Sequence, residues 1–229
     1  TFETNLTLPY LFKSPLGLDL MLRIFKRDSS FTTVNQSAKL NYQINSKHKI
    51  SAGVLNLQSN NLLQDISTSS IFDYKTSYYA LGYQFLNRSS SNLLFPITSF
   101  TNLEYNFGKR KQTNAEEKQY LISIDAFKIF NLDQKNSIYI RVNSSILNSK
   151  TYFENELLRF GGINSIRGFE ENSINASRLG VLASEYRYQL SPSLYVHTII
   201  DAGYFETPIV SDQKLYGFGF GFGLLTDAG

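Results

Sequence analysis

The residues of this sequence best suited to recognition chemistry are one arginine and two carboxylates. Arg167 stands in FGGINSIRGFE, residues 160–170, between an apolar residue and a glycine that precedes an aromatic ring. Glu185 and Asp201 follow it in the chain. A guanidinium can bind two carboxylates through directional, charge-assisted hydrogen bonds, which the ammonium group of lysine cannot match. Such a trio is suited to docking one segment of a chain on another.

The sequence has few residues that could support catalysis or metal binding. The chain has no cysteine, which excludes disulfides and thiolate metal sites. His48 and His197 are the only histidines, and no nearby Ser or Asp has the matching parity except Asp201 on the strand of His197, so a hydrolase site has little support. We expect no enzyme activity, no catalytic residue, no cofactor and no metal site. The net charge of +3 is spread out without a basic stripe, so we expect no nucleic-acid partner.

The elements that must position these side chains are predicted to be β-strands. In residues 34–44, VNQSAKLNYQI, and 136–146, NSIYIRVNSSI, apolar and polar residues alternate with the period of a strand. No segment combines a helix cap with a helical apolar stripe. The alternation predicts strands at 2–11, 16–28, 31–45, 48–58, 74–87, 98–109, 117–130, 135–148, 178–190, 193–205 and 214–226.

The lengths of these segments and of their connections favour an antiparallel transmembrane β-barrel. Most segments have about ten residues or more, whereas strands of soluble domains usually have about 5–6 and tilted membrane-spanning strands need about 9–11. Short turns mostly alternate with long links, of which 148–177 is the longest, as in outer-membrane barrels. Residues 109–117, KRKQTNAEE, are predicted to form a solvated loop. A soluble β-sandwich is the alternative, because it would show the same alternation.

The alternation also assigns side chains to the two faces of the sheet. In 178–190 the lipid-facing side is predicted to carry Leu182, Tyr186, Tyr188 and Leu190. Glu185 therefore lies on the opposite, inner face, and the same reasoning places Asp201 on the inner face of the next strand. Asp125 and Arg141 read as ordinary polar lining of that inner wall.

The stretch GGINSIRGF resembles the signature of the BamA-like superfamily of outer-membrane protein assembly and two-partner secretion transporters. The residues that match its loop motif are Gly161, Gly162, Ser165, Ile166, Arg167, Gly168 and Phe169. Downstream, ASEYRYQL (183–190) looks like the strand after that loop. IIDAGYF (199–205), which contains Asp201 and Gly203, looks like the strand after that.

The resemblance implies a barrel of about sixteen strands in the full protein, of which about eleven are covered here. It implies that residues 1–229 are part of this barrel, with any upstream periplasmic domain outside this chain. The extracellular loop at about 148–177 would fold into the lumen. There Arg167 would dock on Glu185 and Asp201, with Gly203 beside them.

A second motif is YGFGFGFG, residues 216–223, in which rings alternate with glycines. If the rings face lipid, the inner wall of this strand carries Gly217, Gly219, Gly221 and Gly223 and has no side chains. Glycine within a strand often marks a close backbone approach, so one hypothesis is that this wall makes room for the loop at 158–177. The alternative is that the glycines bend or twist the sheet.

The function implied by the resemblance is non-enzymatic insertion or translocation of polypeptides at the outer membrane of a Gram-negative bacterium. Its partners would be outer-membrane lipid, unfolded or β-rich protein substrates, and periplasmic or lipoprotein accessory subunits. The physical basis would be strand addition at a weakly paired barrel edge. The alternatives are a passive outer-membrane pore and the membrane barrel of a fusion with an upstream hydrolase domain.

Overall fold

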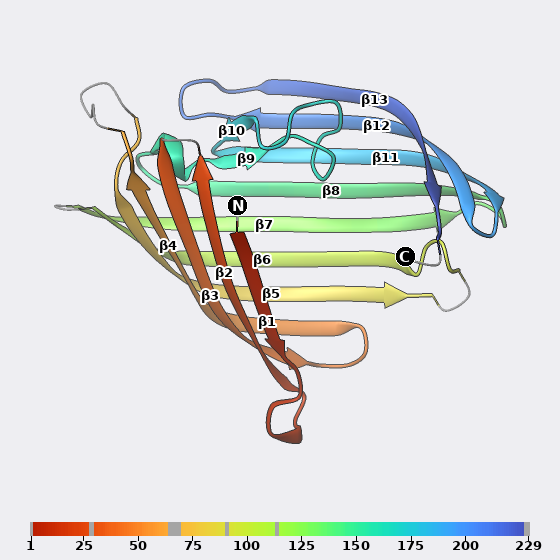
Figure 1. Ribbon diagram of the computed structural model, residues 1–229, viewed down its shortest axis with the longest axis horizontal. Coiled ribbons are helices and arrows are strands. Elements are labelled where there is room, and N and C mark those ends of the chain that lie inside the picture. Colours follow the sequence, from red (N-terminus) through yellow and green to blue (C-terminus); the bar gives the residue numbers. More distant parts are fainter. Residues whose placement is uncertain (1, 28–29, 64–69, 90–91, 113–114, 227–229) are drawn as a thin grey trace. The chain divides into compact units, whose positions relative to one another are not determined.

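The computed structural model describes residues 2–27, 30–63, 70–89, 92–112 and 115–226. In this part of the chain, eleven strands form one sheet in the order β1-β2-β3-β4-β5-β6-β7-β8-β11-β12-β13 (Figure 1). The strands are β1 (Phe2–Leu8), β2 (Leu16–Arg27), β3 (Phe31–Gln43), β4 (His48–Asn61), β5 (Tyr74–Arg88), β6 (Ile97–Gln112), β7 (Ala115–Asn131), β8 (Asn136–Asn148), β11 (Arg178–Ser191), β12 (Leu194–Glu206) and β13 (Gln213–Leu224).

The remaining elements are short. β9 (Leu158–Phe160) and β10 (Ile174–Ala176) pair with each other outside the main sheet. Two single-turn 3-10 helices are η1 (Leu11–Lys13) and η2 (Glu154–Glu156). No helix among the described residues is long and apolar enough to cross a membrane.

The all-β antiparallel fold expected from the alternation is confirmed, and each of the predicted segments corresponds to one strand of the described sheet. The reading of residues 109–117 as a solvated loop is wrong, because β6 continues to Gln112 and β7 begins at Ala115. The physical reason is that polar residues lie on both faces of the two strands here, so the sequence lacks the apolar–polar alternation that predicts a strand. Arg110 on β6 and Glu117 on β7 form an ion pair at 2.6 Å.

The chain divides into two compact units, which are described separately. The first unit consists of residues 1–84, 103–122 and 146–157, and the second of residues 85–102, 123–145 and 158–229. Arg167, Glu185 and Asp201 all belong to the second unit.

In the second unit, the strand register sets the positions of the two carboxylates. β12 pairs with β11 on one side and with β13 on the other, so Asp201 stands opposite both Ala183 and Gly217. Leu182 and Tyr186 on the outer face of β11 are exposed, whereas Glu185 on its inner face is buried. The inner face of this unit is the one that carries Glu185 and Asp201.

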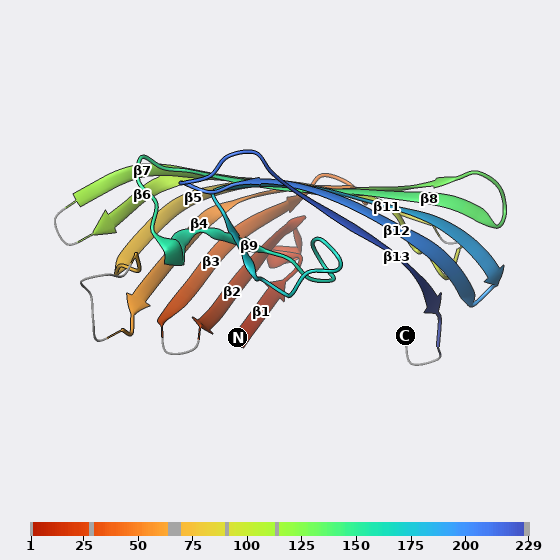
Figure 2. The same ribbon diagram turned by 90° about the horizontal axis from the view of Figure 1, so that it is seen from above.

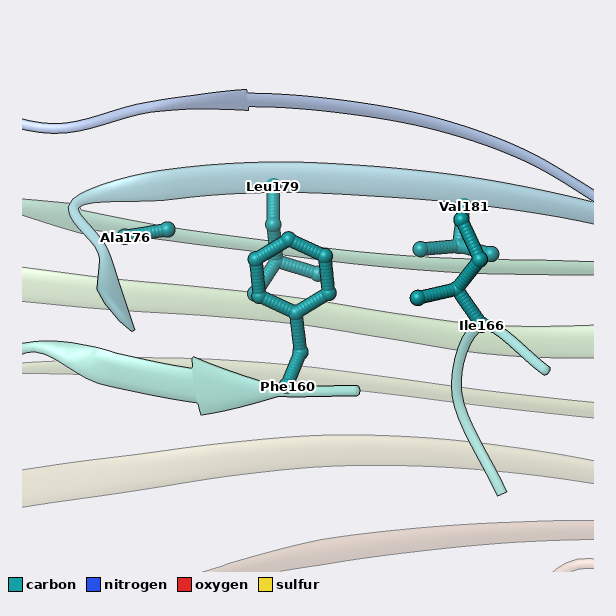
Figure 3. Close-up of a cluster of buried hydrophobic side chains, with 5 residues drawn as sticks. All are labelled: Phe160, Ile166, Ala176, Leu179 and Val181. Carbon is teal, nitrogen blue, oxygen red and sulfur yellow. The ribbon is translucent and has the colours of Figure 1, made fainter. Parts of the chain in front are cut away.

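In the second unit, the part of the link that contains β9 and β10 lies on one side of β11 and β12 (Figure 2). It packs on β11 through a hydrophobic cluster, shown in Figure 3, that consists of Phe160, Ile166, Ala176, Leu179 and Val181. Ile166 has no exposed surface. Since Ile166 is adjacent to Arg167, this apolar contact helps to hold the loop tip against the inner face.

Candidate functional site

The loop between β9 and β10 turns sharply at glycines. Gly161, Gly162 and Gly168 have φ angles of 113°, 93° and 94°, which side chains rarely tolerate. The Ser165 amide donates a hydrogen bond to the Gly162 carbonyl at 3.1 Å. The three glycines of the sequence motif are therefore the residues that allow the chain to reverse and present Arg167.

Arg167 makes a two-pronged contact with Asp201. Its Nε donates to Asp201 Oδ2 at 2.8 Å, and its Nη2 donates to Asp201 Oδ1 at 2.6 Å. The Arg167 amide adds a third hydrogen bond, to Oδ2 at 3.0 Å. The remaining guanidinium nitrogen, Nη1, donates to Glu185 Oε1. The structure thus brings together the arginine and both carboxylates that the sequence singled out.

Burial makes these contacts strong. Asp201 is 0% exposed and Glu185 is 5% exposed. Ionised groups removed from water are costly unless they are paired and hydrogen-bonded. The hydrogen bonds to Asp201, followed by those to Glu185, raise the pKa of the Arg167 guanidinium, so the loop arginine stays charged.

Glu185 contacts two arginines and a histidine. Arg187, on the same face of β11, donates from Nε to Glu185 Oε2 at 2.8 Å. His197 Nδ1 lies 3.1 Å from the same oxygen. The formal charges of Arg167, Arg187, Glu185 and Asp201 cancel, which is the condition for burying all four groups.

The role of Arg187 was missed by sequence reasoning. Its guanidinium lies over the ring of Tyr139, 4.1 Å from the centroid, and over that of Phe95 at 4.9 Å. Phe95 comes from the link between β5 and β6 and packs edge-on against Tyr195. Parity predicts the inner face for Arg187, which stands two residues after Glu185, but parity does not predict which rings it contacts.

A second wall arginine also contacts the loop. Arg141 pairs with Asp125 through two hydrogen bonds, from Nε at 2.8 Å and from Nη2 at 3.0 Å. Its Nη1 donates to the carbonyl of Asn164 in the loop at 3.2 Å. The reading of Asp125 and Arg141 as plain wall lining was therefore incomplete, because the pair also holds the loop just before its tip.

Gly203, Phe169 and Ser165 have different surroundings. A β-carbon at Gly203 would lie 3.0 Å from Cδ1 of Ile166, so the glycine makes room for the loop isoleucine. Phe169 packs at the margin of the hydrophobic cluster. The buried hydroxyl of Ser165 has no hydrogen-bond partner among the described residues.

The glycines of β13 serve two purposes. A β-carbon at Gly217 would collide with the carbonyl oxygen of Arg167. At Gly221 and Gly223 it would instead collide with the rings of His197 and Tyr195 on β12, and at Gly219 it would meet Ile199 at an ordinary 3.7 Å. Among the described residues, the loop thus approaches the glycine wall at Gly217, while two of the other glycines accommodate rings of the neighbouring strand.

Comparison with known proteins identifies the fold. No protein-family model and no curated protein matches the sequence. Among solved structures, CdiB from Acinetobacter baumannii aligns with a TM-score of 0.57 and 18% identity, over 93% of this chain and 41% of that one. BamA from Haemophilus ducreyi, lacking POTRA domains 1–3, aligns with a TM-score of 0.65 and 15% identity, over 90% of this chain and 49% of that one.

The two alignments agree with the resemblance seen in the loop motif. At 15–18% identity they establish a shared fold. This chain spans less than half of the length of either structure. What CdiB and BamA do is therefore a starting point for a proposal about this chain.

Proposed function

We propose, from the fold that this chain shares with CdiB and BamA, that it forms part of a β-barrel in the outer membrane of a Gram-negative bacterium. We further propose that the barrel inserts or translocates polypeptides. Its partners would be membrane lipid, unfolded or β-rich protein substrates, and periplasmic or lipoprotein accessory subunits. The chemistry is non-covalent, since a weakly paired barrel edge can accept a substrate strand through backbone hydrogen bonds.

The outer face of the sheet supports a membrane setting. On β13 the outward rings of Phe218, Phe220 and Phe222 are 76%, 90% and 74% exposed. On β12, Ile200 stands opposite Phe218 and is also exposed. A contiguous apolar surface of this kind is unusual on a soluble monomer and suits contact with lipid chains.

The observation that carries the proposed role of the loop is the bidentate contact between Arg167 and Asp201. Every nitrogen of the guanidinium donates to a carboxylate, and Glu185 also contacts Arg187 and His197. This arrangement suits docking, because neither carboxylate is left free to exchange a proton with a substrate. We propose that the docked loop pre-organises the wall formed by β11, β12 and β13 for transport or insertion.

The test is an Arg167→Ala variant of the full-length protein. Removing one partner of a buried ion pair can cost about 3–5 kcal/mol, and less where water reaches the site. We expect at least about a tenfold loss of insertion or secretion of a β-rich substrate, while the barrel still folds and shows normal heat-modifiable migration on gels. Arg167→Lys should not restore activity, because an ammonium group cannot reproduce the fork.

The matched control is Arg178→Ala on the same unit. Arg178 forms an exposed ion pair with Glu206 at 3.4 Å, and such pairs contribute little. Wild-type activity in Arg167→Ala would refute the role of the loop. A large bilayer conductance that is indifferent to Arg167, with no substrate insertion, would favour the passive pore.

A further inference from the structure

A second buried arginine holds a different part of the link between β8 and β11. Arg110 on β6 is 3% exposed. Its guanidinium pairs with Glu117 on β7 at 2.6 Å and with Glu156 in η2. It also donates to the carbonyl of Thr151 at 3.2 Å and lies over the ring of Phe153, 3.9 Å from the centroid. Thr151, Phe153 and Glu156 all belong to the link that later carries Arg167.

Other wall residues of the first unit complete the contact with η2. Asn155 donates from Nδ2 to the hydroxyl of Ser59 on β4 at 2.8 Å. The hydroxyl of Tyr74 on β5 donates to the Asn155 carbonyl at 3.3 Å. Gln119 on β7 donates to Glu156. These three strands, together with β6, thus hold η2 through side-chain contacts that the strand alternation alone would not reveal.

We propose that Arg110 and Glu156 form a second anchor for this link, and that Arg110 is a positioning residue for the loop that carries Arg167. Residues 149–157 are held in the first unit, and the tip is held in the second. Because both belong to one continuous link, the anchor limits how far the tip can withdraw. The effect on transport rests on the proposed function, whereas the anchor can be measured without it.

The chemistry of the anchor requires arginine. The side chain of Glu156 is 5% exposed, and burial raises the pKa of its carboxyl above its usual range, so the charged form depends on a close counter-charge. One guanidinium reaches both carboxylates and the Thr151 carbonyl while its flat face covers Phe153. The ammonium group of lysine has neither the forked set of donors nor the flat face of a guanidinium.

The two anchors differ in whether the arginine lies on the link or on a strand. At the tip, the arginine is on the loop and both carboxylates are on strands. At the second anchor, the arginine and Glu117 are on strands and Glu156 is on the link. The two anchors share no residue, so each can be weakened while the other is kept.

Trypsin digestion of the full-length protein in lipid bilayers tests the anchor. Lys150 is exposed, and the next residue, Thr151, is tied to Arg110 and Glu117 by its backbone and side chain. We expect Arg110→Met to speed cleavage after Lys150 by about tenfold or more, since cleavage tracks the population of the open form. Arg110→Lys should behave in the same way.

Glu156→Ala, made on the link, provides a second variant in case Arg110→Met fails to fold, and it should also speed cleavage after Lys150. The control is Lys109→Met, because Lys109 is exposed and pairs with Glu116. In Asp201→Asn, cleavage after Arg167 should rise while cleavage after Lys150 stays slow.

Wild-type cleavage after Lys150 in folded Glu156→Ala would overturn the second anchor, as would an equal rate in Arg110→Met and Lys109→Met. Normal substrate insertion in Arg167→Ala would instead refute the proposed role of the docked loop, and a full-length protein that inserts no substrate would refute the proposed function. Either outcome leaves the cleavage result standing.

Discussion

Asp201 and Glu185 contact the same arginine but play different parts. Asp201 accepts three hydrogen bonds from Arg167, so it is dedicated to the loop. Glu185 divides its two oxygens between Arg167 on one side and Arg187 and His197 on the other. Glu185 therefore connects Arg167 to other side chains of the wall, whereas all three of these hydrogen bonds of Asp201 hold the loop tip itself.

At the same scale, Gly217 and Gly219 form a matched pair for a mutational test. A methyl group at Gly217 would collide with the backbone of Arg167, whereas one at Gly219 would meet Ile199 at an ordinary distance. Overpacking of this kind typically costs about 1–3 kcal/mol. We expect Gly217→Ala to displace the tip and speed trypsin cleavage after Arg167, and Gly219→Ala to leave the rate unchanged. Equal rates in the two variants would contradict the close approach at Gly217.

At the scale of the element, side chains of β12 are matched to glycines of β13. On the inner face, Tyr195 and His197 of β12 cover Gly223 and Gly221 of β13, which stand directly opposite them. Rings that lie across strand glycines fill the space left by the missing side chains. The alternation of rings and glycines on β13 is thus matched to the side chains of its neighbour as well as to the loop.

This matching predicts a coupling between Tyr195 and Gly223. Gly223→Val should lower the free energy of unfolding, because the new side chain would occupy the space of the tyrosine ring. In a Tyr195→Ala background the same change should cost less, by about 0.5 kcal/mol or more. Urea unfolding of the four proteins of this cycle in lipid vesicles gives the coupling. Additive effects would show that the ring and the glycine are independent.

For the molecule as a whole, the alternation separates two environments. Inward residues of the second unit form charged clusters, and most outward residues are aliphatic or aromatic over β11, β12 and β13. If the outer face meets lipid, a charge placed there must be carried into the hydrocarbon. If it meets water, the same charge costs little.

A substitution at Phe218, in the middle of β13, distinguishes an outer face that meets lipid from one that meets water. In the full-length protein, Phe218→Arg should reduce stability by about 2–4 kcal/mol if the residue lies near the bilayer midplane. Phe218→Leu is the control, because it keeps the apolar surface. The measurement is the yield and urea stability of folding into lipid vesicles. An unchanged stability in Phe218→Arg would favour a soluble sheet.

The sequence by itself determined the eleven strands of the main sheet and their faces, because a period of two is a local rule. The loop motif singled out Gly161, Gly162 and Gly168, and the structure showed their positive φ angles. With parity and the loop motif, the inward carboxylates Glu185 and Asp201 could be proposed as partners of Arg167.

Only the tertiary structure decided which side chains meet across the sheet. Arg110 and Glu156 are 46 residues apart, and Arg187 meets Phe95 from a distant link. Parity gives the face of each residue, but a contact also depends on where the links fold back and on which strands they cross. The physical reason is that such contacts form between surfaces already built by many strands, so no local pattern encodes them.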